Sequence, residues 1–219
     1  METANANIKS SLKDALETFK YVFTKPGTKA LEKAENFKDA KVSGIFSGIA
    51  VVAYVIVSLI SAMISTVVVK SYFTGKTNVV FENLKNFDFL KNLGDNLLYT
   101  ALAIAIVAAV VYVMGLIFKK QPNFMKLLGV VALGFAPAVC AAFVGNILAY
   151  FWSPLGMFAT GAGLALMISF VVTAINKEIA LEGDKKIFFH AATVTVIYVI
   201  AYLIVTNVLK TSILGGLGF

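Results

Sequence analysis

The sequence predicts an all-α integral membrane protein in which five transmembrane helices form a bundle. Of its 219 residues, 59% are apolar and only 14% are charged, so too few polar side chains are present to cover a soluble domain of this size. The charges also gather in clusters, and the uncharged stretches between them are long enough to cross a bilayer. Amphipathic interfacial helices are expected at the N-terminus and in the first outer loop.

Five apolar segments reach the length of about 20 residues that a helix needs to cross hydrocarbon about 30 Å thick. The 28 residues from Val42 to Val69 carry no charge. Fifty uncharged residues separate Lys126 from Lys177, enough for two spans joined by a turn near Pro154. The sequence therefore predicts a transmembrane domain over 42–209, with spans at about 42–69, 96–118, 127–151, 155–176 and 187–209, and a short outer tail over 210–219.

Residues 1–41 are expected to form a cytoplasmic amphipathic segment. They carry eight Lys and six acidic residues and have no apolar stretch long enough for a cleavable signal core. A second short helix is expected over about 28–40, after a break at Pro26. The first helix, over 7–23, is predicted by an apolar stripe at spacings of three and four, which would anchor it at the membrane interface or dock it on a partner: Ile8, Leu12, Leu16, Phe19 and Phe23.

The first outer loop shows a similar stripe. Its apolar residues predict an interfacial helix that runs from about Asn78 into the span over 96–118. The stripe consists of Val80, Leu84, Phe87, Leu90, Leu93 and Leu97.

The distribution of lysines predicts the orientation. Assigning the non-spanning segments alternately to the two sides places 14 lysines on the side of the N-terminus and 5 on the other side. Because cytoplasmic segments carry an excess of basic residues, we expect a multi-pass protein of the cell membrane with its N-terminus in the cytoplasm and its C-terminus outside.

The same residues make several functions improbable. All 19 basic residues are lysine, so the guanidinium fork that reads bases and clamps phosphates is absent, and no nucleic-acid partner is expected. One Cys (Cys140) and one His (His190) cannot supply an intramolecular disulfide or a typical zinc site, so no metal or cofactor is expected. The predicted spans hold no Asp, Glu, Lys or Arg, which argues against ion-coupled transport and intramembrane metal catalysis. A hydrolase built from Ser169 and His190 remains an alternative.

Three further features concern packing and lipid contact. Pro137 is expected to kink the third span, and a broken span could line the path of a passive or lipid-handling transporter. Lys119, Lys120 and Lys126 form a basic group that could meet lipid headgroups. Small residues at spacings of four predict close helix approach, either within the bundle or, through the first span, between two copies of the chain: Gly44 and Gly48, Ala101, Ala105 and Ala109, and Ala159 and Gly163.

Several short stretches resemble the Yip (Ypt-interacting protein) superfamily of five-span membrane proteins, most closely its bacterial branch. They are Phe23-Thr24-Lys25-Pro26, Phe81-Glu82-Asn83-Leu84-Lys85-Asn86, Lys119-Lys120-Gln121-Pro122-Asn123-Phe124, Phe135-Ala136-Pro137, Ile175-Asn176-Lys177-Glu178 and Leu181-Glu182-Gly183-Asp184-Lys185-Lys186. The resemblance covers most of residues 20 to 200 and contains no catalytic motif. It implies a five-span fold, and for eukaryotic members it implies membrane traffic and Rab-type GTPase partners.

The sequence as a whole favours a non-enzymatic membrane scaffold or adaptor of the Yip type. Its partners are expected to be the lipid bilayer, a protein at the cytoplasmic face and a second copy of the chain. The alternatives are the passive or lipid-handling transporter and the intramembrane serine hydrolase.

Overall fold

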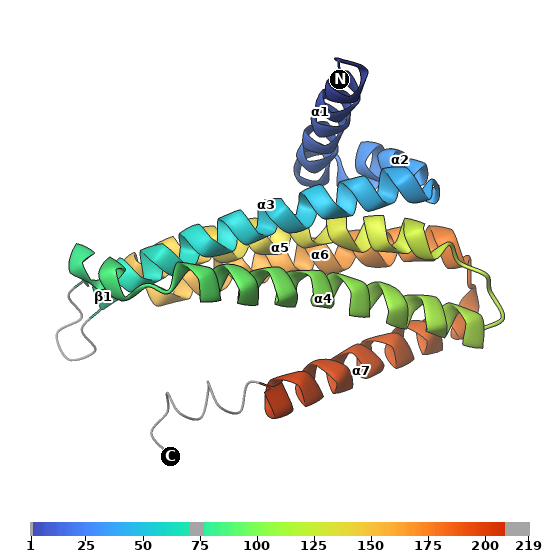
Figure 1. Cartoon of the computed structure of the whole chain (residues 1–219). Coiled ribbons are helices and arrows are strands. Elements are labelled where there is room, and N and C mark those ends of the chain that lie inside the picture. Colours follow the sequence, from blue (N-terminus) through green and yellow to red (C-terminus); the bar gives the residue numbers. More distant parts are fainter. Residues whose placement is uncertain (1, 71–76, 209–219) are drawn as a thin grey trace.

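Five long apolar helices build the molecule (Figure 1). The computed structural model describes residues 2–70 and 77–208, and side chains at 13–68, 78–200 and 202–204. By length and hydropathy each of the five helices could cross a membrane, which confirms the predicted fold class. The tail over 210–219 and the last residue of the fifth predicted span lie outside the described residues. The helices are α3 (Ala40–Val67), α4 (Phe89–Ile117), α5 (Phe124–Phe151), α6 (Ser153–Ile179) and α7 (Gly183–Val208).

Polar side chains mark where three of these helices begin. The Asp39 carboxylate accepts hydrogen bonds from the backbone N–H groups of Lys41 and Val42, at 2.8 and 3.1 Å. Asp88 caps α4 and Asn123 caps α5 in the same way. These caps satisfy N–H groups that have no partner within the helix, and they stand at the borders between charged and apolar sequence.

The centre of the bundle is α5. Half of its most apolar window is buried, against about a third for α3 and α4. It forms a tight hairpin with α6, in which the extended residue Trp152 is the whole connection. The helix α7 is the least buried of the five, and in Figure 1 it diverges from the bundle toward its C-terminal end. Phe118 and Phe189 join it to the end of α4, with ring centroids 5.5 Å apart.

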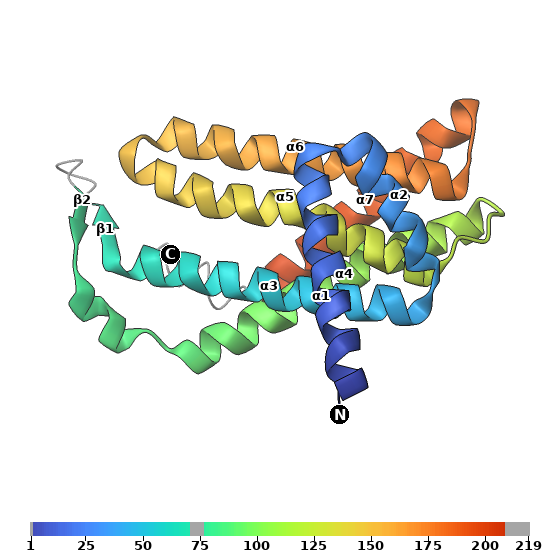
Figure 2. The same cartoon turned by 90° about the horizontal axis from the view of Figure 1, so that it is seen from above.

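A helix outside the bundle, α1 (Glu2–Thr24), lies crosswise on α3 and α5, and its N-terminal end points away from them (Figures 1 and 2). The helix predicted over 7–23 is therefore present. In place of one helix over 28–40, the chain makes three short helical turns: η1 (Pro26–Ala30, π-helical), α2 (Leu31–Ala34) and η2 (Glu35–Lys38, 3₁₀). The buried residues Leu31, Ala34 and Phe37 recur every three positions, which matches the tighter 3₁₀ repeat better than the α-helical one.

The loop between α3 and α4, which was predicted to be the first outer loop, differs from the prediction of a continuous helix starting at Asn78. Two short antiparallel strands, β1 (Val68–Lys70) and β2 (Thr77–Val79), pair directly after α3, and the 3₁₀ turn η3 (Phe81–Asn86) follows. The Asn83 side chain donates to the Thr66 carbonyl at 3.1 Å and so holds η3 against the end of α3. Valines at 67–69 and 79–80 favour strand pairing, and the Asp88 cap starts a new helix at Phe89.

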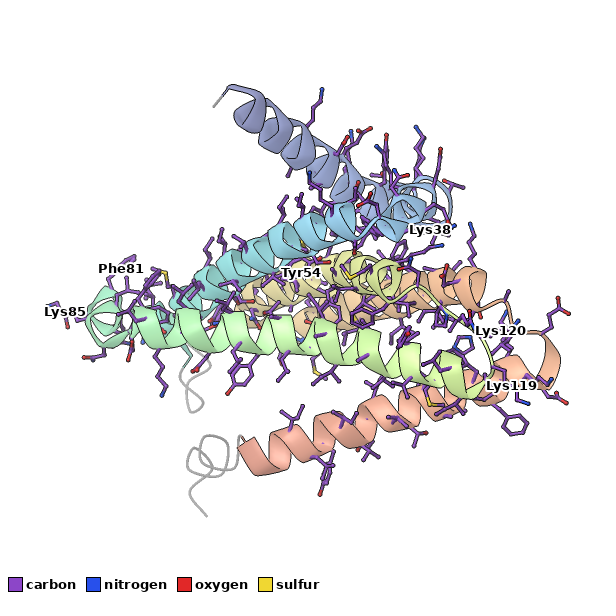
Figure 3. The ribbon with its side chains drawn as sticks, turned by 45° about the vertical axis from the view of Figure 1, so that its right-hand side comes forward. Lys38, Tyr54, Phe81, Lys85, Lys119 and Lys120 are labelled. Atoms are coloured by element: carbon purple, nitrogen blue, oxygen red, sulfur yellow. The ribbon has the colours of Figure 1, made fainter. Side chains whose placement is uncertain are left out.

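Labelled residues identify the two ends of the bundle. Lys38, Lys119 and Lys120 lie at one end, which we call the basic end, whereas Phe81 and Lys85 lie at the other, the loop end (Figure 3). Tyr54 lies between them, and its hydroxyl donates to the Ala132 carbonyl of α5.

Candidate functional site: a polar cluster at the basic end

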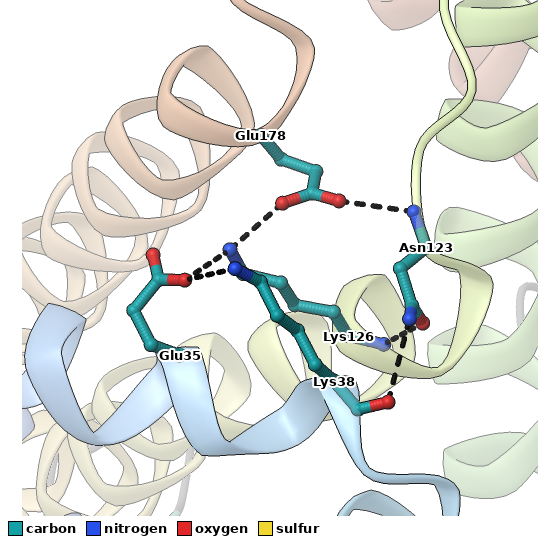
Figure 4. A network of polar contacts seen from close by, with 5 residues as sticks. All are labelled: Glu35, Lys38, Asn123, Lys126 and Glu178. Carbon is teal, nitrogen blue, oxygen red and sulfur yellow. Dashed lines mark hydrogen bonds and ion pairs between the residues drawn. The ribbon is translucent and has the colours of Figure 1, made fainter.

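A buried ammonium group forms the centre of the basic end. Lys126 stands in the first turn of α5, and its side chain is only 6% exposed. Its Nζ lies 2.7 Å from a carboxylate oxygen of Glu178, in the last turn of α6, and 2.8 Å from one of Glu35, in η2 (Figure 4). The lysine therefore joins the α5–α6 hairpin to the N-terminal segment.

The helix dipoles explain why Lys126 and Glu178 belong together. A cation is unfavourable at the N-terminal end of a helix and an anion is unfavourable at the C-terminal end. Lys126 and Glu178 each occupy the end that suits the opposite charge. Since α5 and α6 run antiparallel, these two ends lie side by side, and the ion pair offsets both unfavourable placements.

Asn123 extends the cluster through three groups. Its side-chain oxygen accepts from the Lys126 backbone N–H at 3.0 Å, and its side-chain amide donates to the Lys38 carbonyl at 3.3 Å. Its backbone N–H donates to Glu178 at 3.0 Å, as Figure 4 shows. Asn123 therefore caps α5 and also contacts Glu178 of the ion pair and Lys38 of the N-terminal segment.

The cluster is balanced in charge. The Lys38 ammonium lies 3.1 Å from Glu35, so two cations face two carboxylates. The hydrogen bond from Lys126 holds the pKa of Glu35 below its ordinary value of 4.5, although partial burial opposes the shift. Ion pairs of this kind hold together the segments that carry them.

Apolar packing closes the cluster against the bundle. Phe37 of η2 packs on Gly129 of α5, where a Cβ atom would lie 2.6 Å from the ring. The same ring lies 4.7 Å from that of Phe46, and Ser43 donates to the Met125 carbonyl. We call residues 26–38 the clasp, because they hold α1 on α3 and α5 through this packing and the Lys126 contacts.

The three lysines predicted to meet headgroups have different surroundings. Lys126 differs from that prediction, because its ammonium is buried and held by two carboxylates. Lys120 donates to the carbonyl of Ala180, the left-handed residue that ends α6, at 3.1 Å. Lys119 is exposed at the basic end, so headgroup contact stays a prediction for it.

The small residues predicted to allow close helix approach fall into a group that packs inside the bundle and a group that faces outward. Gly163 packs as predicted for close approach, since a Cβ there would meet Ala141 and the Pro137 carbonyl of α5. Ala159 is partly buried on the same helix. Gly145 and Gly156, which sequence reasoning missed, bring the hairpin backbones together near its turn. The expected approach within the bundle is not made by the residues that face outward: Gly44, Gly48, Ala101, Ala105 and Ala109.

These residues face outward because a different face of each helix is buried. The buried face of α3 carries Ser43, Phe46 and Ala50, and its glycines lie beside that face. That of α4 carries Ile104 and Ala108. Self-association through the outward glycines stays a prediction.

The two residues named for the alternative hydrolase, Ser169 and His190, make contacts with different partners. His190 Nε2 lies 2.8 Å from the Asn176 side-chain oxygen, which ties the start of α7 to the end of α6. Ser169 is exposed on α6, and its carbonyl accepts from Thr173. Within the described ranges, no group of three or more His, Cys, Asp or Glu side chains is placed to hold a metal ion.

Pro137, predicted to kink the third span, is buried inside α5. Its carbonyl faces Gly163 of α6, so the proline lies in the core of the hairpin. The helix continues on both sides of it.

Two of the stretches quoted for the family resemblance meet at the basic end. Asn123 comes from one of them and Glu178 from the other, and a hydrogen bond joins the two residues. Asn176, from the second stretch, bonds to His190 of α7. A third stretch contains Pro137, which lies in the core of the α5–α6 hairpin.

Comparison with protein families gives one finding. The profile of the Yip1 domain matches residues 20–205, which is most of the chain. Neither the curated proteins nor the solved structures give a match. Members of the matched family are membrane proteins of vesicle trafficking and are generally non-enzymatic. Since the match covers the end of α1, the clasp and nearly all of the five long helices, the chain belongs to the Yip1 domain family.

Proposed function

We propose that this protein is a non-enzymatic membrane scaffold that recruits a protein partner to the membrane surface through α1. The observation that carries the proposal is an exposed stripe on that helix. It is formed at spacings of three and four by Lys13, Leu16, Lys20 and Phe23.

The opposite face of α1 packs against the bundle. Ala15, Thr18 and Val22 are buried against the rest of the chain, and the Phe19 ring lies 5.1 Å from that of Phe46. The bundle therefore fixes which face of α1 points outward. A mixed apolar and basic face suits an acidic, amphipathic partner, and its flanking lysines also suit an anionic lipid surface.

The clasp supports this function because it sets the position of α1. Its contacts with Lys126 and Gly129 hold the helix across the bundle close to the basic end. A scaffold needs such a fixed presentation, since ordering the helix only on binding would weaken affinity.

The orientation belongs to the proposal as well. The cluster, the clasp, Lys119 and Lys120 lie at the basic end. Counted along the sequence, 14 lysines fall on the side of the N-terminus and 5 on the other, and on the positive-inside rule we assign the basic end to the cytoplasm of the cell membrane. We propose the bacterial branch of the family for this chain, on the motifs given above.

The test changes the exposed stripe and leaves its buried face intact. Leu16 is 63% exposed and Phe23 is 46% exposed, so Leu16→Ser with Phe23→Ser keeps the packing of α1 on the bundle. The matched control is Leu90→Ser, at a site that is 78% exposed near the loop end. Complexes extracted from the native membrane are quantified by native mass spectrometry. At least a tenfold loss of a stoichiometric protein partner in the double variant alone is expected, whereas equal recovery from all three proteins would overturn the proposal.

A further inference from the structure

A cavity of about 520 Å³ opens between α3, α5 and α6 in the half of the bundle near the loop end. In Figure 2, α3 diverges from α5 toward this end. Its walls are apolar residues such as Val57, Phe135 and Val139. The volume lies within the range of small-molecule pockets, about 300 to 1,000 Å³.

A polar stripe interrupts these walls. On α3, Ser58, Ser61 and Ser65 recur at spacings of three and four, so they share one face of the helix. The Asn146 side chain of α5 donates to the Ser61 hydroxyl at 2.8 Å, and Thr160 of α6 completes the set. Each lining group is uncharged.

The polarity of the cavity is graded with depth. At 1.5 Å per residue, Asn146 lies about 8 Å from the end of α5, and Phe135 lies about 24 Å from it. On α3, Ser61 lies about 9 Å from the helix end and Val57 about 15 Å. A helix of 28 residues is about 42 Å long and a hydrocarbon core about 30 Å thick, so about 6 Å of helix lies beyond each edge. The Ser61–Asn146 pair therefore lies close to the hydrocarbon edge, Ser58 lies about one turn deeper beside Val57, and Phe135 lies deepest.

This profile matches a lipid. Ser65 and Asn146 are exposed on the outside of the bundle, close to the hydrocarbon edge, which is the depth of the ester groups of a lipid. We propose that the cavity is a binding site for a membrane lipid of the leaflet at the loop end, whose glycerol ester groups bond to the Ser61–Asn146 pair and whose acyl chain fills the apolar part. Because no charged side chain lines the cavity, we assign lipid recognition to the ester groups rather than to the headgroup.

A second copy of the chain fits the cavity less well. A helix with its side chains is about 10 Å wide and needs an open face along its length. The cavity is instead lined by side chains of three helices, α3, α5 and α6. The proposal is independent of the scaffold function, because the site lies away from α1 and the clasp.

The test fills the cavity or removes its amide. A phosphatidylcholine with a photoreactive group midway along its acyl chain is placed in nanodiscs with the protein, and cross-linked residues are mapped by mass spectrometry. Cross-links are expected on the walls formed by α3 and α5. Ala142→Phe fills the cavity and should lower their yield at least fivefold, while Ala109→Phe, on the outer face of α4, should leave it unchanged.

The polar part is tested by Asn146→Leu. Losing one hydrogen bond, about 1 kcal/mol, predicts about a fivefold drop in yield. Asn96→Leu is the matched control, because Asn96 bonds to a carbonyl of its own helix. A phosphatidylglycerol probe with the same acyl chains should behave alike. Unchanged yields in both cavity variants, or disulfide trapping between two copies through Ser61→Cys, would overturn the assignment.

Discussion

Replacing Lys126 with methionine removes the ammonium from the polar cluster and keeps most of the side-chain length. Its loss leaves the Glu178 carboxylate, which is 12% exposed, without its cation. Removing one partner of a buried ion pair costs about 3 to 5 kcal/mol. Asn123 still donates to Glu178, and Glu35 is 45% exposed and turns to water, so the lower value of about 3 kcal/mol applies.

Hydrogen exchange of the amides at the end of α6, around Glu178, in nanodiscs measures this cost as an opening equilibrium. Since each 1.36 kcal/mol is a factor of ten, Lys126→Met should raise the opening constant about 100-fold. The control is Lys38→Met, which removes an ion pair whose lysine is 61% exposed and should change the constant less than threefold. Equal exchange in the two variants would refute the reasoning.

A double variant separates charge from packing. Lys126→Met combined with Glu178→Gln removes both buried charges, so it should recover much of the loss caused by Lys126→Met alone. No recovery would show that the loss comes from packing of the lysine stem.

Three smaller effects follow from other contacts. Gly163→Ala should lower the unfolding midpoint in nanodiscs because its Cβ meets the backbone of α5, whereas Gly161→Ala, in open space, should not; equal midpoints would contradict the packing. Tyr54→Phe should destabilise the fold by about 1 kcal/mol in denaturant titration through loss of the bond to Ala132, and an unchanged midpoint would argue against that bond. Because the pKa of Glu35 is lowered in the folded state, Glu35 contributes fully to the stability of the fold above about pH 4.5, and this contribution is lost as the pH falls through the folded pKa. Spin-label distances between α2 and α6 should therefore widen at that pH in the wild type and not in Glu35→Gln.

The five long helices could be predicted because their signals are local. Uncharged runs of bilayer length are visible in any window of the sequence, and the residues Asp39, Asp88 and Asn123 start three helices by contacts within four positions. The loop between α3 and α4 was harder to predict, since its leucines fit a helical repeat while strand pairing and the Asp88 cap decide the structure.

The polar cluster depends on contacts between distant residues. Lys126 and Glu35 are 91 positions apart, and no local pattern links them. One signal was nevertheless present, because a lysine in the first turn of a helix and a glutamate in the last turn of the next both oppose the helix dipole. Small-residue spacing likewise identifies a face but not its direction, which is why Gly163 packs inside and Gly48 faces outward.

The one-residue connection at Trp152 has a consequence for biogenesis. An unpartnered α5 would expose its proline-freed carbonyl to lipid, and α6 is the helix that packs against that proline. With no loop between them, the two helices lack a polar segment that could wait on one side of the membrane. Closing so short a connection also costs little chain entropy. We therefore expect the hairpin to enter the bilayer as one unit.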